Sequence, residues 1–187
     1  MRMEKREYIE KALSLGASDA AWIRTQDIRV DDRFPEYCKE PGCSGYGRSM
    51  SCPPHVMGPQ RFREYITRFE SALAFKFDIP WEILVSDDRY PVFRVLHETA
   101  TSLEAYAVEE GCLHSKAYAG GSCKNIFCSE HKNCNVLFGT GECRNRGIST
   151  QSMSGNGVDF QQIVKRLNWN DGLDKSTGVI AGIVLIG

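Results

Sequence analysis

Seven of the eight cysteines of this chain lie in two short segments with similar spacing. We call residues 38–52 the first cysteine loop and residues 123–143 the second cysteine loop. The cysteines of the two loops are Cys38, Cys43 and Cys52, then Cys123, Cys128, Cys134 and Cys143. Thiolates at short spacings on glycine-rich backbone can surround a soft metal centre without crossing a protein core. The pattern therefore predicts a cysteine-bound metal site, with all seven thiols as candidate ligands.

An iron–sulfur cluster of the 4Fe–4S type usually takes four thiolates. The second cysteine loop supplies four by itself, whereas the first supplies three. The missing ligand of the first loop could be Cys112, His55, an exogenous ligand or a thiol from the second loop. We expect Cys112 to be a buried non-ligand, because a strand after it would separate it from the second loop. The sequence thus favours one or two iron–sulfur clusters that exchange electrons with a partner protein.

Two other interpretations stay open. Four cysteines can also close a structural zinc site, which would make the protein a scaffold without redox chemistry. Zinc sites usually contain a gap of two to four residues between ligands, and ferredoxin motifs contain a two-residue gap, so the spacing decides for neither metal. The three-cysteine first loop allows a third possibility, an enzyme in which an open iron position binds substrate. No motif for nucleotide binding, zinc hydrolysis or serine catalysis is present.

Composition is that of an ordinary globular protein. The chain has 187 residues, a formal charge of −1 and 42% apolar residues, which fits one domain spanning residues 1–187. No strong basic field favours nucleic acid or anionic lipid, and no apolar segment is long enough to span a membrane. The charged N-terminus lacks a signal-peptide core, so we expect a cytoplasmic protein. In a reducing cytosol, metal binding explains the cysteines better than disulfides do.

The elements that would position these cysteines alternate between helix and strand. Helical spacing of apolar residues predicts helices at residues 3–15, 59–69, 91–111 and 159–167. Apolar runs or alternation predict strands at residues 20–30, 73–79, 114–119 and 179–186. We therefore expect an α/β or α+β fold with a single sheet of about four strands flanked by helices. Each cysteine loop should leave a strand and lead into a helix, which is a common place for a site.

Three segments carry a resemblance to a known family. They are residues 43–54, which end in Cys52-Pro53-Pro54; residues 121–144, with the later cysteines; and residues 151–159, which contain Gln-Ser-Met and Gly-Val-Asp. Together they resemble an uncharacterised prokaryotic family of predicted metal-binding proteins, a domain of unknown function with a Cys-Pro-Pro motif. The resemblance implies a cysteine-bound metal centre of iron–sulfur type and no particular reaction. One departure is visible: prolines would be expected after Arg144, where this chain has Asn145-Arg146-Gly147.

Overall fold

A mixed sheet of five strands forms the centre of the molecule. The computed structural model describes residues 5–39, 42–169 and 174–187. Across the sheet the strand order is β1-β2-β5-β3-β4, and every neighbouring pair is antiparallel except β3 and β4. The strands are β1 (Asp19–Arg24), β2 (Ser71–Pro80), β3 (Lys116–Ala119), β4 (Gln151–Ser152) and β5 (Thr177–Ile186). The expected single sheet is confirmed. The expected strand number falls one short, because two-residue β4 is too brief to leave an alternating pattern.

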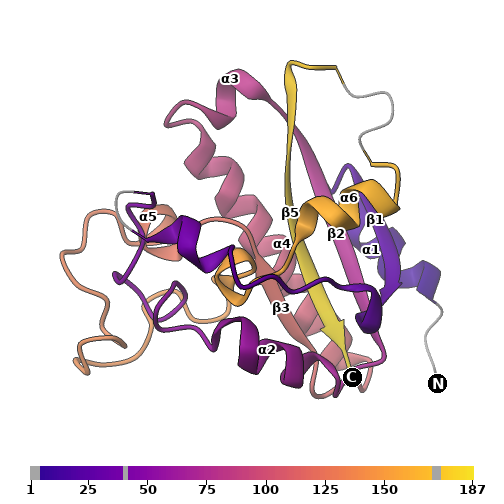
Figure 1. Cartoon of the computed structure of the whole chain (residues 1–187), viewed down its shortest axis with the longest axis horizontal. Coiled ribbons are helices and arrows are strands. Elements are labelled where there is room, and N and C mark those ends of the chain that lie inside the picture. The colour runs from indigo at the N-terminus through magenta and orange to yellow at the C-terminus, as the bar shows by residue number, and fades with distance from the viewer. Residues whose placement is uncertain (1–4, 40–41, 170–173) are drawn as a thin grey trace.

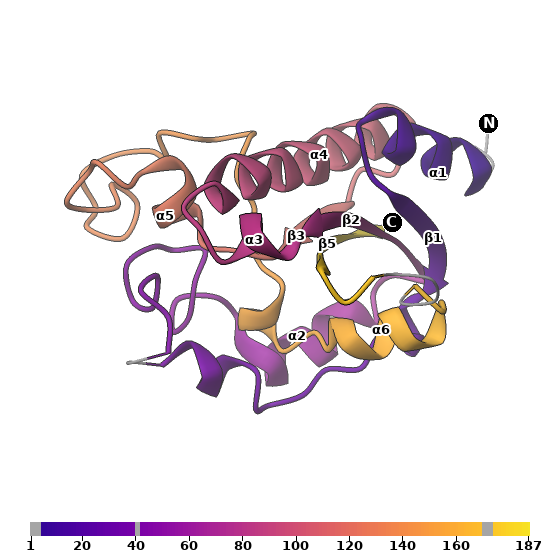
Figure 2. The ribbon, with the colours of Figure 1, turned by 90° about the horizontal axis from the view of Figure 1, so that it is seen from above.

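Helices cover both faces of this sheet, as Figure 2 shows from above. On one face lie α1 (Lys5–Ser14) and α4 (Arg89–Glu109), and on the other lie α2 (Gly58–Ile66) and α6 (Phe160–Arg166). Two short helices, α3 (Trp81–Leu84) and α5 (Cys123–Phe127), add about one turn each. The four expected helices are confirmed, and the Asp159 carboxylate caps α6 by accepting from the Gln162 backbone N–H at 3.1 Å.

Alternation along the central strands divides the core into two layers. In β2, Ala72 and Ala74 face the layer of α2 and α6, whereas Leu73 and Phe75 face the layer of α1 and α4. All four are fully buried. A strand with helices on both faces must be apolar on both, which is why β2 and β5 read as nearly continuous hydrophobic runs.

The expected strand over residues 20–30 is wrong in its second half. The strand ends at Arg24, and a 3₁₀ turn follows at Thr25–Asp27. The Thr25 hydroxyl donates to the Phe69 carbonyl, which holds this turn beside the end of α2. Extended pairing resumes only at Val30, which bridges Val158. A hydrogen bond from the Thr25 side chain to a backbone carbonyl 44 residues away thus overrides an apolar spacing that suits a strand.

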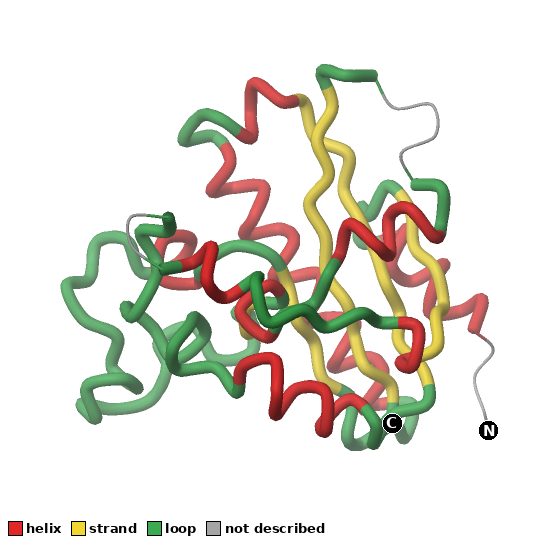
Figure 3. Tube along the Cα trace, in the orientation of Figure 1, coloured by secondary structure: helices red, strands yellow, loops and turns green. Residues whose placement is uncertain are grey.

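Both cysteine loops lie at the same side of the molecule. The tube in Figure 3 shows irregular segments gathered beyond β3, at the left of the view, and Figure 1 identifies them by colour as the two loops. The second loop leaves β3 as expected, but α5 begins at Cys123 and the chain then returns to β4 rather than passing directly into a long helix. The parallel pairing of β3 and β4 brings both ends of this excursion to one sheet edge.

A buried histidine of α4 closes the base of the second loop. The His97 Nδ1 atom accepts from the Thr150 backbone N–H at 3.1 Å, so Nε2 carries the proton and donates to the Gly120 carbonyl at 3.0 Å. Gly120 follows β3 and Thr150 precedes β4, so one imidazole ties together the two ends of the second-loop excursion. Burial lowers the pKa of His97 to about 4, because the site favours the neutral ring.

Stability should therefore depend on pH through His97. Unfolded His97 takes up a proton near pH 6.5 and folded His97 only near pH 4, so the free energy of unfolding should fall as the pH drops through this window. The loss attributable to this residue should reach about 3 kcal/mol. Urea unfolding at several pH values would measure it. In His97→Gln the pH slope should flatten over this range, whereas the control His55→Gln, at an exposed position, should keep it. Equal slopes in both variants would contradict the assignment.

Candidate metal centre

Direct contacts join the two cysteine loops. The Cys52 thiol donates to the Ser122 hydroxyl at 3.3 Å, and the Asn125 side-chain amide donates to the Ser44 hydroxyl at 2.9 Å. These pairs link residues 70 and 81 positions apart in the chain. The contacts place the cysteines of both loops in one region, although the chain between the loops crosses the sheet.

A glycine in the first loop allows the close approach of Ser122. A Cβ atom at Gly45 would lie 2.3 Å from the Ser122 Oγ atom and 2.6 Å from its Cβ atom, which is far inside van der Waals contact. The backbone N–H of Gly45 also donates to the Cys43 sulfur at 3.4 Å. Gly45 therefore lets the Ser122 side chain, at the start of the second loop, pack directly against the backbone of the first loop.

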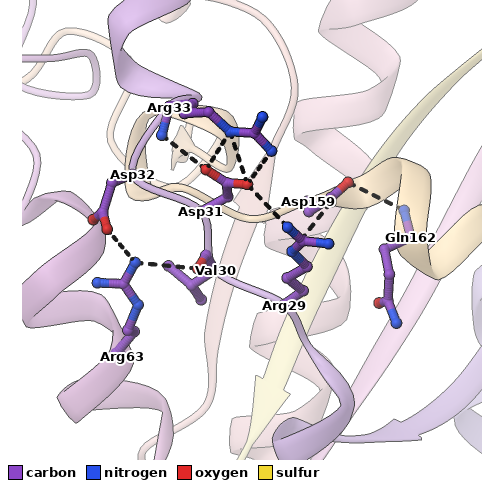
Figure 4. Close-up of polar contacts among 8 residues, drawn as sticks. All are labelled: Arg29, Val30, Asp31, Asp32, Arg33, Arg63, Asp159 and Gln162. Carbon is purple, nitrogen blue, oxygen red and sulfur yellow. Dashed lines mark hydrogen bonds and ion pairs between the residues drawn. The ribbon is translucent and has the colours of Figure 1, made fainter.

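An ion-pair network fixes the chain that leads into the first loop, as Figure 4 shows. The Asp31 carboxylate is bound by the side chain and backbone of Arg33, which hold its pKa well below the usual range. Arg29 approaches the carboxylates of Asp31 at 3.3 Å and Asp159 at 3.9 Å. On the other side, Arg63 of α2 contacts Asp32 at 2.7 Å. The segment before the first loop is thereby attached to both α2 and α6.

Residues 151–159, the third segment that resembles the family, pack against the first loop. The Ser152 backbone N–H donates to the Ser51 carbonyl at 2.9 Å, which joins β4 to the loop. At Gly155, a Cβ atom would lie 2.8 Å from Pro53, so only glycine lets this turn pack against the Cys-Pro-Pro step. Gly157 has a φ of +84°, and its carbonyl accepts from the Asp31 N–H at 2.7 Å. The motif at residues 151–159 thus positions the first cysteine loop.

The three thiols of the first loop share one cavity of about 280 Å³. Cys52 is buried, and Cys38 and Cys43 are half-buried. Burial raises the pKa of the Cys52 thiol, and the neighbouring Ser122 and Ser49 hydroxyls oppose this shift. Burial likewise raises the pKa of Cys38, with a further contribution from Cys43. The three thiols therefore line one cavity, and burial favours the protonated form of Cys38 and Cys52 unless positive charge is brought to them.

Cys123 lies where the two loops meet. Burial raises the pKa of its thiol, the hydroxyls of Ser51 and Ser49 in the first loop oppose that shift, and the Cys52 and Cys143 thiols raise it further. A cysteine of the second loop thus faces the first loop. Among the candidates for the fourth ligand of the first loop, a thiol from the second loop is therefore suitably placed, and that thiol belongs to Cys123.

The other thiols of the second loop receive hydrogen bonds from backbone and amide groups. Asn145 donates through its side chain to the Cys128 sulfur at 2.9 Å and through its backbone N–H to the Cys143 sulfur at 3.4 Å. Burial favours a raised pKa at Cys134, but backbone N–H groups of Leu137, Met50 and Val136, aided by Arg144, outweigh it and lower the pKa. Such donors stabilise a thiolate, the form that binds metals.

A buried lysine orders the same loop. The Lys124 ammonium, with 1% of the residue exposed, donates to the carbonyls of Cys128 and His131. These bonds fold the chain after α5 into a tight turn and satisfy a charge that would otherwise be costly to bury. Lys124 therefore positions the middle of the second loop.

Several candidates from the sequence lie apart from these contacts. Cys112 is half-buried rather than fully buried as expected, and it packs with the α1–α4 layer, where the Tyr8 hydroxyl is 3.7 Å from its sulfur. From Phe93 at the cavity to Glu109 at its end, α4 extends about 24 Å, so Cys112 lies at the far end of the helix. His55 and His131 are exposed. Within the described ranges, no three Cys, His, Asp or Glu side chains are arranged closely enough to hold a metal ion as they stand.

A comparison with protein families agrees with the resemblance noted in the sequence. Residues 21–186 match the model of a family described as Predicted metal-binding protein (DUF2284). The chain belongs to this family. The earlier resemblance to a family of predicted metal-binding proteins is therefore confirmed. No curated protein and no solved structure matches the chain. None of the helices that the structure describes is long and apolar enough to cross a membrane.

Some residues of the site have no signature in the sequence. Ser49, Ser122 and Asn145 contact sulfur, yet serine and asparagine are common in any loop. A partial signal existed at Asn145, since it stands where the family resemblance led us to expect proline. Its backbone N–H, which proline would lack, donates to Cys143.

We expect Gly45→Ala to disrupt the docking of the two loops. The added methyl group collides with Ser122, and relieving this overlap should lower the free energy of unfolding by about 1–3 kcal/mol. Gly120→Ala is the matched control, because a Cβ atom there meets nothing closer than 3.6 Å. Chemical denaturation would measure stability, and thiol labelling followed by mass spectrometry would measure exposure of Cys52. If both variants label alike, the contact does not hold the loops together.

Proposed function

We propose that this protein holds one or two iron–sulfur clusters on its two cysteine loops and exchanges electrons with a partner protein. Membership of a predicted metal-binding family supports metal binding in general. The identity of the metal and the redox role are inferred from the surroundings of the thiols. The proposed ligands are the seven cysteines of the two loops.

The observation that carries this proposal is the set of donors turned toward sulfur. Within the described ranges, the buried Ser49 hydroxyl has no hydrogen-bond partner of ordinary geometry, yet it lies beside the thiols of Cys52 and Cys123. A buried unpaired hydroxyl costs free energy, and a thiolate or sulfide acceptor would satisfy it. Gly45 and both donors of Asn145 also point at sulfur. Buried free cysteines need no such shell, because they pack as small hydrophobes.

The number of thiols and the exposure of Cys143 favour iron–sulfur clusters over a single zinc site. One structural zinc ion takes four ligands, whereas the two loops carry seven free thiols. Cys143 is exposed, and the nearby chain presents Val136 and Phe138 to solvent with 40% and 58% exposure. A centre held partly by Cys143 would lie close to the surface, where a partner could approach it. When bound, a cluster supplies one-electron chemistry, while the protein supplies ligation and hydrogen bonds to sulfur.

Purification without oxygen tests the metal directly. We expect a brown protein that contains iron and acid-labile sulfide, because the thiolates and their donors suit a cluster. Metal analysis and visible absorption would be measured on the same sample. A colourless protein with stoichiometric zinc would remove the electron-transfer proposal, since zinc has no redox chemistry in this range.

Two cysteine substitutions provide the matched comparison for that experiment. Cys128→Ser removes a sulfur that accepts a 2.9 Å hydrogen bond from Asn145, and we expect it to lower iron content and stability. Cys112→Ser changes a thiol at the far end of α4 and should leave iron and absorption intact. Loss of iron in the Cys112 variant would show that it is a ligand after all.

The Asn145 amide should tune the potential of the centre. A donor to sulfur stabilises the reduced state, which carries more negative charge, so Asn145→Ala should lower the reduction potential by about 20–60 mV. Asn135→Ala is the control, because its amide donates to the Glu142 carbonyl rather than to sulfur. Redox titration followed by visible absorption would compare the variants, with iron content measured alongside. Equal potentials in the two variants would exclude an Asn145 contact with the centre.

A further inference from the structure

The cavity beside the first cysteine loop has lining residues that metal binding does not explain. Besides the three thiols, residues of α4 and α5 line it. From α4 come Arg89, Tyr90 and Phe93, and from α5 come Asn125 and Ile126. The cavity lining thus combines thiols with aromatic and polar side chains.

Arg89 is the one charged residue among the described residues that line this cavity. Its guanidinium stacks over the Tyr90 ring at 4.9 Å and donates to the Tyr90 hydroxyl at 3.2 Å. Its ion pair is with Asp87 at 3.9 Å, a carboxylate whose side chain is 92% exposed. An ion pair that exposed is weak in water. The planar fork of Arg89 is therefore held in place by an aromatic ring and remains available to an anion.

We propose that the cavity binds a small monocarboxylate with a flat, apolar body. An arginine fork pairs with carboxylate in a bidentate manner, and a single cation suits a single negative charge better than the double charge of a phosphate. The rings of Tyr90 and Phe93 can cover an apolar body, while Asn125 offers a polar contact. A volume of about 280 Å³ lies at the lower end for ligand pockets and limits the ligand to a small molecule. The proposal rests on the proposed function in placing this ligand next to a centre on the first loop.

Benzoate and its uncharged analogue benzamide are suitable probes, because they differ in charge and share size and shape. We expect the anaerobically purified protein to bind benzoate with a Kd of about 10 mM or tighter in equilibrium dialysis. Benzamide should bind at least roughly tenfold more weakly. Benzoate that binds no better than benzamide, or not at all in this range, would overturn the proposal.

Two arginine variants locate the charge. Arg89→Gln should weaken benzoate binding by roughly tenfold or more and leave benzamide binding unchanged. Arg94→Gln removes the same charge from α4, but its guanidinium lies over the Phe127 ring at 4.6 Å, outside the cavity lining, so benzoate binding should persist. Equal benzoate binding by wild type and Arg89→Gln would contradict the assignment.

Metal analysis of each sample separates this proposal from the proposed function. Iron-free protein that binds benzoate through Arg89 would refute the clusters and retain the pocket. Protein that contains iron and sulfide but ignores benzoate would refute the pocket alone. Loss of iron in Arg89→Gln with unchanged benzoate binding would show that Arg89 serves the centre instead, and would also overturn the pocket proposal.

Discussion

The site depends on the close contact between Gly45 of the first cysteine loop and Ser122, the residue immediately before the second cysteine loop. These residues come from opposite halves of the chain, and a single methyl group at Gly45 would separate them. Only when the loops meet do Ser49 and Ser51 reach the Cys123 thiol and the Met50 backbone reach Cys134. The surroundings of sulfur are therefore a tertiary property, produced by docking rather than by either loop alone.

The sheet makes this docking possible by holding the ends of both loops. Parallel pairing of β3 and β4 returns the second loop to its starting edge, and His97 fixes both ends to α4. The ion pairs of Asp31 and the turn at Gly155 do the same for the first loop. Few of these contacts are apolar. The conformational entropy lost when the two loops are ordered is offset by hydrogen bonds and by packing against the sheet and helices.

Helices and strands with a regular spacing of apolar residues were predictable from the sequence, whereas contacts between distant segments were not. The helices and central strands follow from apolar spacing, because burial against a sheet imposes that spacing. Two-residue β4 and the turn at Thr25 leave no such pattern, since each depends on a partner far away in the chain. The cysteines stood out by type and spacing. Ser49 and Asn145 did not, because their role comes only from the sulfur that folding brings beside them.

The two loops differ in the surroundings of their cysteine sulfurs, and so in the form of the thiol that each loop favours. Thiols of the first loop face a cavity in which Arg89 is the one charged residue among the described lining residues, and burial raises the pKa values of Cys38 and Cys52. In the second loop, backbone donors lower the pKa of Cys134, and Cys143 is exposed. The hydrogen bonds to sulfur therefore favour the thiolate at Cys134, whereas burial favours the thiol at Cys38 and Cys52. Cys123 lies near both Cys52 and Cys143 and so joins the two sets of thiols in space.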